Sequence, residues 1–433
     1  EYKNYKERDI INMKKIIIDG GQEISGTIKI SGAKNSIVAL IPASILTSGK
    51  CVIKNVPDIS DVRILLEIMR ELGSEIIFEN ETIIIDNSNV KNKEITEEFA
   101  SKLRASYYFM GSLIGKFHKV DIACPGGCVI GSRPIDIHLD SFKKMGIEID
   151  EQQSKFVMTV DELKGNHFYL NFPSVGATIN IMIASTLAKG QTIIENAAKE
   201  PEIANVASFL NSMGAKIFGA GTSKIIIDGV DELYDGFVEV IPDRIEAGTY
   251  LIIGSLLGNN LTIENIIESH IESMLYKLKE AGIKYESKGN SITITAAKNL
   301  KPINIKTTVY PGFPTDLGQP MSTLLTQCEG ECLFEETIYE NRLRHIPHLN
   351  SMGANIKVFD NQALILGKTP LHGKKVKATD LRAGASMLVA GLIADGRTEI
   401  YNIEHLLRGY ERIVDKLSQV GVQIKLIEDE ENI

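Results

Sequence analysis

The chain has 433 residues, more than one ordinary hydrophobic core can hold, so two domains are expected. Its apolar content of 43% and charged content of 24% are typical of a soluble protein, and no apolar run reaches the length of a membrane span. The net charge of -9 argues against a general nucleic-acid binder, because phosphate backbones bind basic surfaces, but it permits a local cationic pocket for an anionic metabolite.

Residues 1–12 are polar and aperiodic, and a strand-like run follows Met13. We therefore expect a natural start at Met13 and a non-native or disordered extension before it. No secretory signal is visible, and the five cysteines are an odd number, so free thiols in a reducing cytoplasm are expected. Cys-x3-Cys occurs twice, but zinc sites favour Cys-x2-Cys, so we predict no metal site and no cofactor.

A helical stretch that ends in glycine and precedes an extended apolar run occurs six times along the chain. Helices commonly end in a left-handed residue, which glycine tolerates best, so each glycine is a predicted helix C-cap. The six positions are Gly73, Gly146, Gly214, Gly282, Gly353 and Gly421. Their near-constant spacing indicates repeated units of about 70 residues each.

A second type of helix alternates with the first and is rich in Ala, Ser, Leu and Ile. These helices, each followed by a β-rich run, lie within residues 35–56, 104–123, 179–197, 250–266, 317–336 and 384–403. They are apolar on nearly every face, so they should be buried. We predict two compact α/β domains of three units each, with helices inside, sheets outside and a boundary near residues 240–243. A one-dimensional solenoid is the competing arrangement.

Between residues 124 and 134 the sequence holds three glycines, two prolines, two cysteines and an arginine. Such a composition excludes a regular helix or a central strand. The Gly-Gly pair before Cys128 predicts a loop that carries a thiol into a site, and Arg133 would favour its thiolate or hold an anion beside it. A surface turn with two incidental cysteines is the alternative.

Polar residues stand where the buried helices should begin, and the N-termini of such helices attract anions. They include Lys34-Asn35, Arg104, Ser174-Val175-Gly176, Asp243-Arg244, Asp316 and Arg382, with Arg342 and Arg408 elsewhere. If these ends converge, they suit a substrate with phosphate and carboxylate groups. Each one alone could be a helix cap or a surface pair. No Walker A or dinucleotide-binding motif, nucleophile elbow or zincin helix is present.

Eight stretches in order along the chain resemble the enolpyruvyl transferase family. They read SGAKNS, CPGGCVIGSRPIDIHL, FPSVGATINIM, PDRIEAGTY, YPGFPTDLGQP, YENRLRHIPHLNSMGA, TDLRAGAS and LLRGYERIVDKL. The resemblance covers essentially everything from Met13 onward. It implies two inside-out α/β barrels, each built from three βαβαββ-type repeats, with the active site between them. Residues 34–241 would form the first domain, and residues 13–33 with 242–433 the second.

The resemblance further implies transfer of the enolpyruvyl group of phosphoenolpyruvate to the 3'-hydroxyl of UDP-N-acetylglucosamine, with release of phosphate. In the family this opens peptidoglycan synthesis in the cytoplasm, without nucleic acid or membrane. Two alternatives stay open: the branch that acts on 3-phosphoshikimate, which resembles the cysteine loop poorly, and a non-catalytic paralogue that binds sugar nucleotide. RNA 3'-phosphate cyclases share a related unit but are disfavoured by the motifs and the acidic balance.

The family pattern also implies roles for individual residues. Lys34, Arg133 and Arg408 resemble the cations that hold phosphoenolpyruvate, and Cys128 matches the catalytic cysteine and the target of the epoxide phosphonate fosfomycin. Asp316 matches a sugar-nucleotide contact and the base that accepts the hydroxyl proton. The remaining substrate-binding candidates are Asn35, Arg104, Pro134, Ile135, Asp136, Ile137, Ser174, Val175, Gly176, Ile338, Arg342 and Arg382. Phe172 stands where some family members have a lysine near the phosphates, and Cys124 stands where leucine is common in the family.

Overall fold

The computed structural model describes residues 14–125 and 135–428. The expectations for residues 1–12 and for Cys128, Arg133 and Pro134 therefore lie outside the described residues. The chain separates into two compact units. We call Ser31–Pro242 the first unit, and the residues up to Ile30 together with Asp243–Ile433 the second unit.

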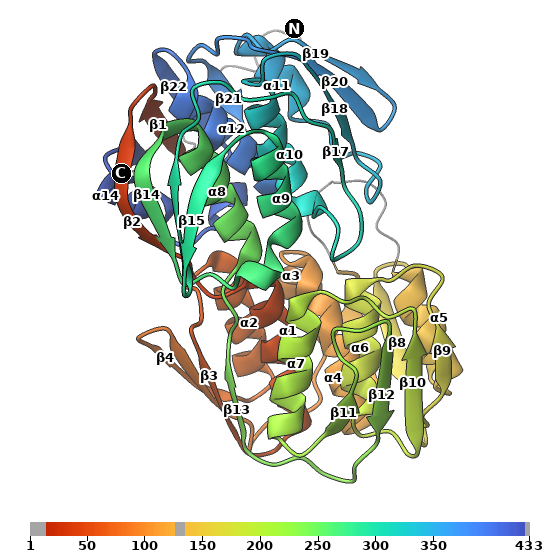
Figure 1. Cartoon of the computed structure of the whole chain (residues 1–433). Helices are drawn as coiled ribbons and strands as arrows, with labels where there is room; N and C mark the ends of the chain where they lie inside the picture. Colours follow the sequence, from red (N-terminus) through yellow and green to blue (C-terminus); the bar gives the residue numbers. More distant parts are fainter. Residues whose placement is uncertain (1–13, 126–134, 429–433) are drawn as a thin grey trace, which may run out of the picture. The chain divides into compact units, whose positions relative to one another are not determined.

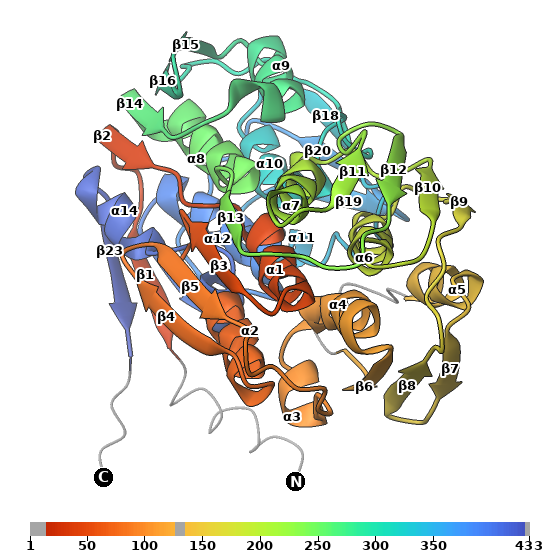
Figure 2. The same cartoon turned by 90° about the horizontal axis from the view of Figure 1, so that it is seen from below.

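The first unit surrounds a group of packed helices with strands (Figure 1, Figure 2). Its helices are α1 (Lys34–Ala43), α2 (Ser60–Glu71), α3 (Glu97–Ala100), α4 (Tyr108–Phe117), α5 (Asp136–Lys144), α6 (Val175–Ser185) and α7 (Pro201–Ser212), with 3-10 turns η2 (Ser44–Leu46) and η3 (Arg104–Tyr107). Its strands are β3 (Lys50–Lys54), β4 (Glu75–Glu79), β5 (Thr82–Asp86), β6 (Lys119–Ala123), β7 (Glu148–Glu151), β8 (Lys155–Thr159), β9 (His167–Tyr169), β10 (Gln191–Glu195), β11 (Lys216–Phe218), β12 (Lys224–Asp228) and β13 (Gly236–Glu239).

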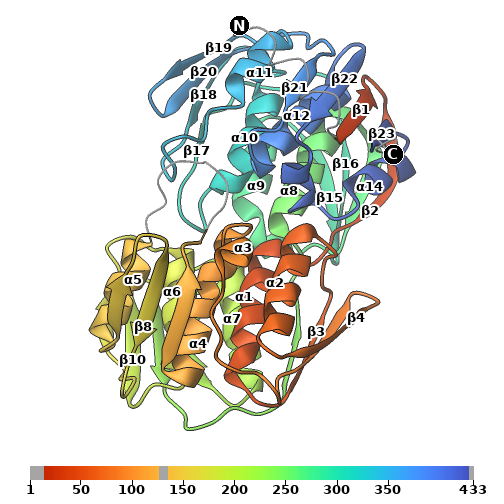
Figure 3. The same cartoon turned by 180° about the vertical axis from the view of Figure 1, so that it is seen from behind.

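The second unit has the same plan, with α8, α10 and α12 side by side in its interior (Figure 3). Its helices are α8 (Arg244–Leu257), α9 (Glu272–Glu280), α10 (Thr315–Leu325), α11 (Ile346–Ser351), α12 (Leu381–Ile393), α13 (Glu404–Leu407) and α14 (Ile413–Gln419), with the 3-10 turn η4 (Glu268–His270). Its strands are β1 (Lys15–Asp19), β2 (Ile24–Lys29), β14 (Gly258–Glu264), β15 (Lys284–Lys288), β16 (Ser291–Thr295), β17 (Ile305–Lys306), β18 (Glu331–Glu335), β19 (Ile356–Phe359), β20 (Gln362–Leu366), β21 (Lys375–Lys377), β22 (Arg397–Tyr401) and β23 (Gln423–Ile427).

The interior helices are the ones that the sequence predicted to be buried. In α10 every residue from Leu317 to Leu325 is buried, and in α12 every residue from Arg382 to Leu392. By contrast, α2 buries one face, through residues such as Val62, Leu65 and Met69. Because the interior helices contact protein on all sides, they need small and apolar residues around their whole circumference.

The sheets repeat one pattern. Five of the six sheets in the described residues have an edge strand parallel to its neighbour, followed by two antiparallel pairings. The sixth, β6-β8-β7, has an isolated parallel bridge between Ile95 and Ile122 at the corresponding edge. The predicted α/β fold, with helices inside and sheets outside, is confirmed, and each wall consists of three separate sheets.

The six predicted C-cap glycines all adopt positive φ. The angles are 106° at Gly73, 88° at Gly146, 104° at Gly214, 89° at Gly282, 115° at Gly353 and 101° at Gly421. Each glycine follows one of the helices α2, α5, α7, α9, α11 and α14, and a strand begins within a few residues after it. A side chain at these positions would strain the backbone, so the repeat depends on glycine there.

The first strands of the chain complete sheets of the second unit. β1 lies between β22 and β23 and pairs antiparallel with both, while β2 pairs parallel with β14. The N-terminal strands therefore supply pairings that the C-terminal repeats would otherwise lack.

Candidate active site

In the second unit, the carboxylate of Asp316 is held by two arginines that approach from different segments. Nη2 of Arg342 donates to Oδ1 at 2.6 Å, and Nη2 of Arg382 donates to Oδ2 at 2.9 Å. The two guanidinium side chains are 1% and 5% exposed, whereas the Asp316 side chain is 25% exposed. Asp316 is therefore the solvent-accessible end of a buried charge cluster.

Asp316 lies in the first turn of α10, whose N-cap is Pro314. The alternative interpretation, in which Asp316 is simply the helix cap, does not describe the structure, because both of its oxygens bind arginines. The side chain of Asp316 is 25% exposed, so solvent still reaches this carboxylate although both arginines bind it. This geometry is compatible with a proton acceptor held in one orientation.

Arg382 is fixed by hydrogen bonds at both ends. Its backbone N–H donates to Oδ1 of Asp380, the N-cap of α12, at 2.8 Å, and its Nη1 donates to the Tyr410 hydroxyl at 3.3 Å. Burial opposes the charge on Arg382, but Asp316, Tyr410 and Asp243 together outweigh this effect and raise the pKa of the guanidinium above its usual value. The cluster thus keeps a permanent cation against Asp316.

Two other candidates of the second unit lie close to this cluster in the fold. Arg408 follows α13, which packs against α12, and a Cβ atom on the adjacent Gly409 would lie 2.7 Å from the side chain of Leu381. Ile338 lies in the segment after β18, where its backbone N–H donates to Oε1 of Glu336 at 2.7 Å. The structure therefore brings both of them to the region where α10 and α12 begin.

In the first unit, Lys34 is the first residue of α1 and is followed by Asn35. Nζ of Lys34 forms an ion pair with Oδ2 of Asp61 at 2.7 Å, and the two side chains are 14% and 1% exposed. The buried carboxylate of Asp61 therefore fixes the position of a lysine side chain that is itself mostly buried.

A second group in the first unit surrounds the start of α6. Ser174 caps this helix by accepting from the Ala177 N–H at 3.3 Å, and Val175 and Gly176 form its first turn. A Cβ atom on Gly176 would lie 2.9 Å from the Tyr107 hydroxyl and 3.1 Å from Nε2 of His138. Glycine is therefore required for the close approach of α6 to these two side chains.

His138 was missed by the sequence interpretation, although it stands in the quoted motif RPIDIHL. The buried Asn180 fixes its tautomer. Oδ1 of Asn180 accepts from the Gly111 N–H at 3.0 Å, so its Nδ2 faces Nδ1 of His138 at 3.0 Å and must donate to it. Burial and the Arg104 guanidinium lower the pKa of His138 to about 3. The imidazole is therefore neutral at physiological pH, with its remaining proton on Nε2.

The other candidates of the first unit fall into two sets. Arg104 begins η3, and Ile135, Asp136 and Ile137 begin α5, which packs against α6. Cys128, Arg133 and Pro134 lie outside the described residues. The structure therefore groups Arg104, the start of α5 and the start of α6, and leaves the cysteine loop as a prediction.

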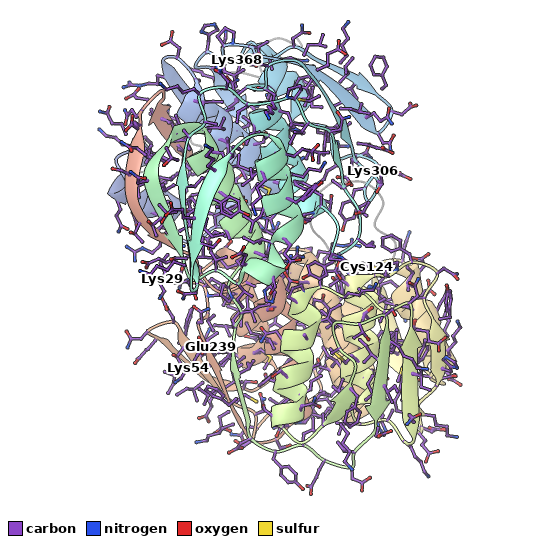
Figure 4. All side chains as sticks on the ribbon, viewed as in Figure 1. Lys29, Lys54, Cys124, Glu239, Lys306 and Lys368 are labelled. Atoms are coloured by element: carbon purple, nitrogen blue, oxygen red, sulfur yellow. The ribbon has the colours of Figure 1, made fainter. Side chains whose placement is uncertain are left out.

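The two residues that depart from the family pattern are both at the surface. Phe172 is 42% exposed, and its carbonyl accepts from the Ser174 N–H at 2.7 Å. Cys124 follows β6 and is labelled in Figure 4. Partial burial and the carboxylate of Glu97 raise the pKa of the Cys124 thiol, which makes it a poor nucleophile at neutral pH.

Comparison with known proteins places this geometry in a family. The family model for EPSP synthase (3-phosphoshikimate 1-carboxyvinyltransferase) matches residues 18–417. UDP-N-acetylglucosamine 1-carboxyvinyltransferase 2 of Bacillus cereus is 50% identical over 413 residues, which cover 95% of this chain and 96% of the relative. The chain belongs to the enolpyruvyl transferase family. It is an enzyme of the carboxyvinyltransferase type.

Further relatives and solved structures agree with this assignment to the enolpyruvyl transferases. Proteins of the same name from Bacillus subtilis (strain 168) and Listeria monocytogenes are 49% and 48% identical, each over 95% of this chain and 96% and 97% of their own length. The enolpyruvyl transferase NikO from Streptomyces tendae has a TM-score of 0.89 and 25% identity, with 97% of this chain and all of that chain covered. EPSP synthase from Acinetobacter baumannii shares the fold at a TM-score of 0.73 and 17% identity, with 96% of this chain and all of that chain covered.

The described residues contain neither a candidate metal centre nor a helix able to span a membrane. No group of three or more His, Cys, Asp and Glu side chains in residues 14–125 and 135–428 could hold a metal ion. Within the same ranges, no helix combines the length and the apolar character that crossing a membrane requires.

Proposed function

We propose that this enzyme transfers the enolpyruvyl group of phosphoenolpyruvate to the 3'-hydroxyl of UDP-N-acetylglucosamine and releases phosphate. The observation that carries the proposal is the identity of about half over nearly the full length with transferases of that name. The family model's own description refers to 3-phosphoshikimate, but the EPSP synthase structures are only 17% and 18% identical to this chain. The reaction would be the first committed step of cytoplasmic peptidoglycan synthesis.

The second unit supplies the groups that suit the acceptor hydroxyl. Asp316 accepts the proton of the 3'-hydroxyl as its oxygen forms a bond to C2 of phosphoenolpyruvate. Arg342 and Arg382 hold the carboxylate so that its exposed side faces the substrate. Ile338 contacts the sugar nucleotide, and Arg408 binds phosphoenolpyruvate.

The first unit supplies the groups that suit the enolpyruvyl donor and the nucleotide. Lys34, with Arg133, offsets the charge of phosphoenolpyruvate, which is often the largest contribution to such catalysis. Cys128 delivers a proton to C3, so that C2 becomes electrophilic, and its thiol can also add covalently to the donor. The tetrahedral adduct then loses the C3 proton and its phosphate, which restores the double bond.

The nucleotide is bound by the group around the start of α6. The backbone N–H groups of Val175 and Gly176 lie at the positive end of that helix, and Arg104 adds a guanidinium. Asn35, Pro134, Ile135, Asp136 and Ile137 complete the expected contacts.

Phosphate release from the purified protein tests the proposal. We expect release that requires both phosphoenolpyruvate and UDP-N-acetylglucosamine, with no release when 3-phosphoshikimate replaces the sugar nucleotide. Release with phosphoenolpyruvate and 3-phosphoshikimate, but not with phosphoenolpyruvate and UDP-N-acetylglucosamine, would assign the chain to the other branch of the family. Binding of UDP-N-acetylglucosamine without any phosphate release would instead indicate a non-catalytic paralogue.

A further inference from the structure

A buried carboxylate, Glu336, lies near the proposed catalytic group and takes no part in the proposed reaction itself. Glu336 follows β18 and is 1% exposed. Its Oε1 accepts from Thr307 Oγ1 at 2.9 Å and from the backbone N–H groups of Ile338 and Tyr339 at 2.7 and 3.1 Å. Its Oε2 accepts from Thr315 Oγ1 at 2.8 Å. Four donors therefore converge on one carboxylate.

The chemistry of this site requires an acceptor-only side chain. Among the described residues, no lysine, arginine or histidine forms an ion pair with Glu336, so neutral donors alone balance its burial. A buried anion costs free energy unless it is fully hydrogen-bonded, and a carboxylate accepts from backbone N–H groups more strongly than an amide does. The main chain of Glu336 is fixed as well, because its N–H donates to the Asn361 carbonyl and its carbonyl accepts from Asn361 Nδ2.

The donors come from three separate segments of the second unit. Thr307 follows β17, next to Lys306, which is labelled in Figure 4. Thr315 is the first residue of α10 and directly precedes Asp316. Ile338 and Tyr339 directly precede the turn that contains Arg342. Glu336 therefore ties the start of α10 to the segment that carries both Ile338 and Arg342.

These contacts close into a ring. The Arg342 guanidinium lies 5.3 Å from the centre of the Tyr339 ring, and its Nη2 donates to Asp316. Asp316 is the neighbour of Thr315, whose hydroxyl donates to Glu336. Glu336 in turn accepts from the backbone N–H of Tyr339, so the circuit of contacts is closed. A change at Glu336 would shift Asp316 and Arg342 relative to each other, although Glu336 touches neither of them.

We propose that Glu336 is a positioning residue for the transfer reaction, which sets the orientation of Asp316 and Ile338 toward the sugar nucleotide through Thr315 and the 338–342 segment. The proposal rests on the proposed roles of Asp316 and Ile338. A displacement of reacting groups by about 1 Å can cost 100-fold in rate, so a small shift of this segment is sufficient.

Kinetics of three variants test the proposal. Glu336→Gln keeps the size of the side chain and removes the charge, and Thr315→Val removes only the link to α10. For both we expect kcat to fall and KM for UDP-N-acetylglucosamine to rise, with kcat/KM lower by about 10- to 100-fold. KM for phosphoenolpyruvate should stay within twofold, since the Glu336 carboxylate accepts from Thr307, Thr315, Ile338 and Tyr339, none of which is a proposed phosphoenolpyruvate ligand.

The matched control is Thr323→Val. Thr323 lies in the same helix, α10, and its Oγ1 donates to the Ser386 carbonyl at 3.2 Å and lies 2.8 Å from Oγ of Ser386, so the variant also loses buried hydroxyl contacts. We expect its melting temperature to fall at least as much as that of Thr315→Val, with kcat and both KM values unchanged. Loss of activity in all three variants in proportion to the loss of melting temperature would overturn the proposal.

The double variant Glu336→Gln/Thr315→Val measures the coupling. If Glu336 acts on Asp316 through Thr315, the double variant should lose less kcat/KM than the product of the two single losses. Fully multiplicative losses would contradict this route. If Glu336→Gln kept the kcat and KM values of wild type, Glu336 would have only a structural role and the proposal would be wrong. Failure of the proposed function is seen separately in wild type. If wild type releases phosphate with 3-phosphoshikimate, the variants are assayed with that acceptor; if it binds UDP-N-acetylglucosamine without releasing phosphate, the increase expected for KM is sought in Kd.

Discussion

The buried charge cluster around Asp316 predicts which of two variants, Asp316→Asn or Arg342→Met, loses more stability. Asp316→Asn removes the carboxylate that Arg342 and Arg382 share, and the side chains of these two arginines are 1% and 5% exposed. Two buried cations then share one amide oxygen. Removing one partner of a buried ion pair costs about 3–5 kcal/mol, and we expect the lower end, about 3 kcal/mol, because the amide oxygen still accepts one hydrogen bond.

Arg342→Met perturbs the same contact from the other side. It removes a buried cation together with its desolvation cost, and it leaves Asp316 paired with Arg382 and 25% exposed to solvent. Methionine fills most of the volume of the arginine stem, so we expect a loss of about 1–2 kcal/mol. Asp316→Asn should therefore destabilise the protein about twice as much as Arg342→Met.

Urea unfolding followed by far-UV circular dichroism measures both variants, since the chain contains no tryptophan for fluorescence. We expect the urea midpoint to fall in the order wild type, Arg342→Met, Asp316→Asn at an unchanged m-value. A larger loss for Arg342→Met would refute the reasoning, because packing of the arginine, and not charge balance, would then dominate the cluster.

Three further predictions concern the catalytic thiol, the start of α6 and the buried His345. Treatment with fosfomycin should leave an adduct on Cys128, detected by peptide mass spectrometry, because the pKa of Cys124 is raised; an adduct only on Cys124 would contradict the assignment of the catalytic thiol. Gly176→Ala should raise Kd for UDP-N-acetylglucosamine at least about tenfold in calorimetry, since its methyl group would lie 2.9 Å from the Tyr107 hydroxyl, and unchanged Kd would remove this segment from the binding site. Burial lowers the pKa of His345 to about 4, so the unfolded state binds a proton first as the pH falls, and His345 alone should lower stability below pH 6.5 by about 1.4 kcal/mol per pH unit until pH 4. The buried His138 adds its own decline, so His345→Gln should make the fall of the urea midpoint with pH less steep without abolishing it, and an unchanged slope would contradict the contribution of His345.

Local rules were sufficient for the repeated parts of the chain. The glycine-terminated helices were visible from the sequence because helix capping involves only neighbouring residues, and all six glycines indeed have positive φ. The interior helices were visible because their composition is apolar on every face. Starts of helices such as Ser174 and Lys34 followed from the same local patterns.

Contacts between distant segments were outside the reach of these rules. The sequence marked Asp316, Arg342 and Arg382 as separate polar residues, but their joining depends on α10, α12 and the segment after β18 packing together. His138 was missed because its tautomer depends on Asn180, which comes from another helix and reads in the sequence as part of an apolar stretch. Glu336 was missed because an isolated glutamate after a strand is most often a surface residue.

The order of the amino acids by itself determined the repeats, the class of fold and the family to which the enzyme belongs, because these properties depend on local periodicity and on long motifs. Only the tertiary structure decided which charges meet, which proton His138 keeps and which buried carboxylate orients its neighbours. Those properties depend on burial and on distances between residues far apart in the chain, and a hydrogen bond or an ion pair exists only where the fold brings its two partners within about 3 Å.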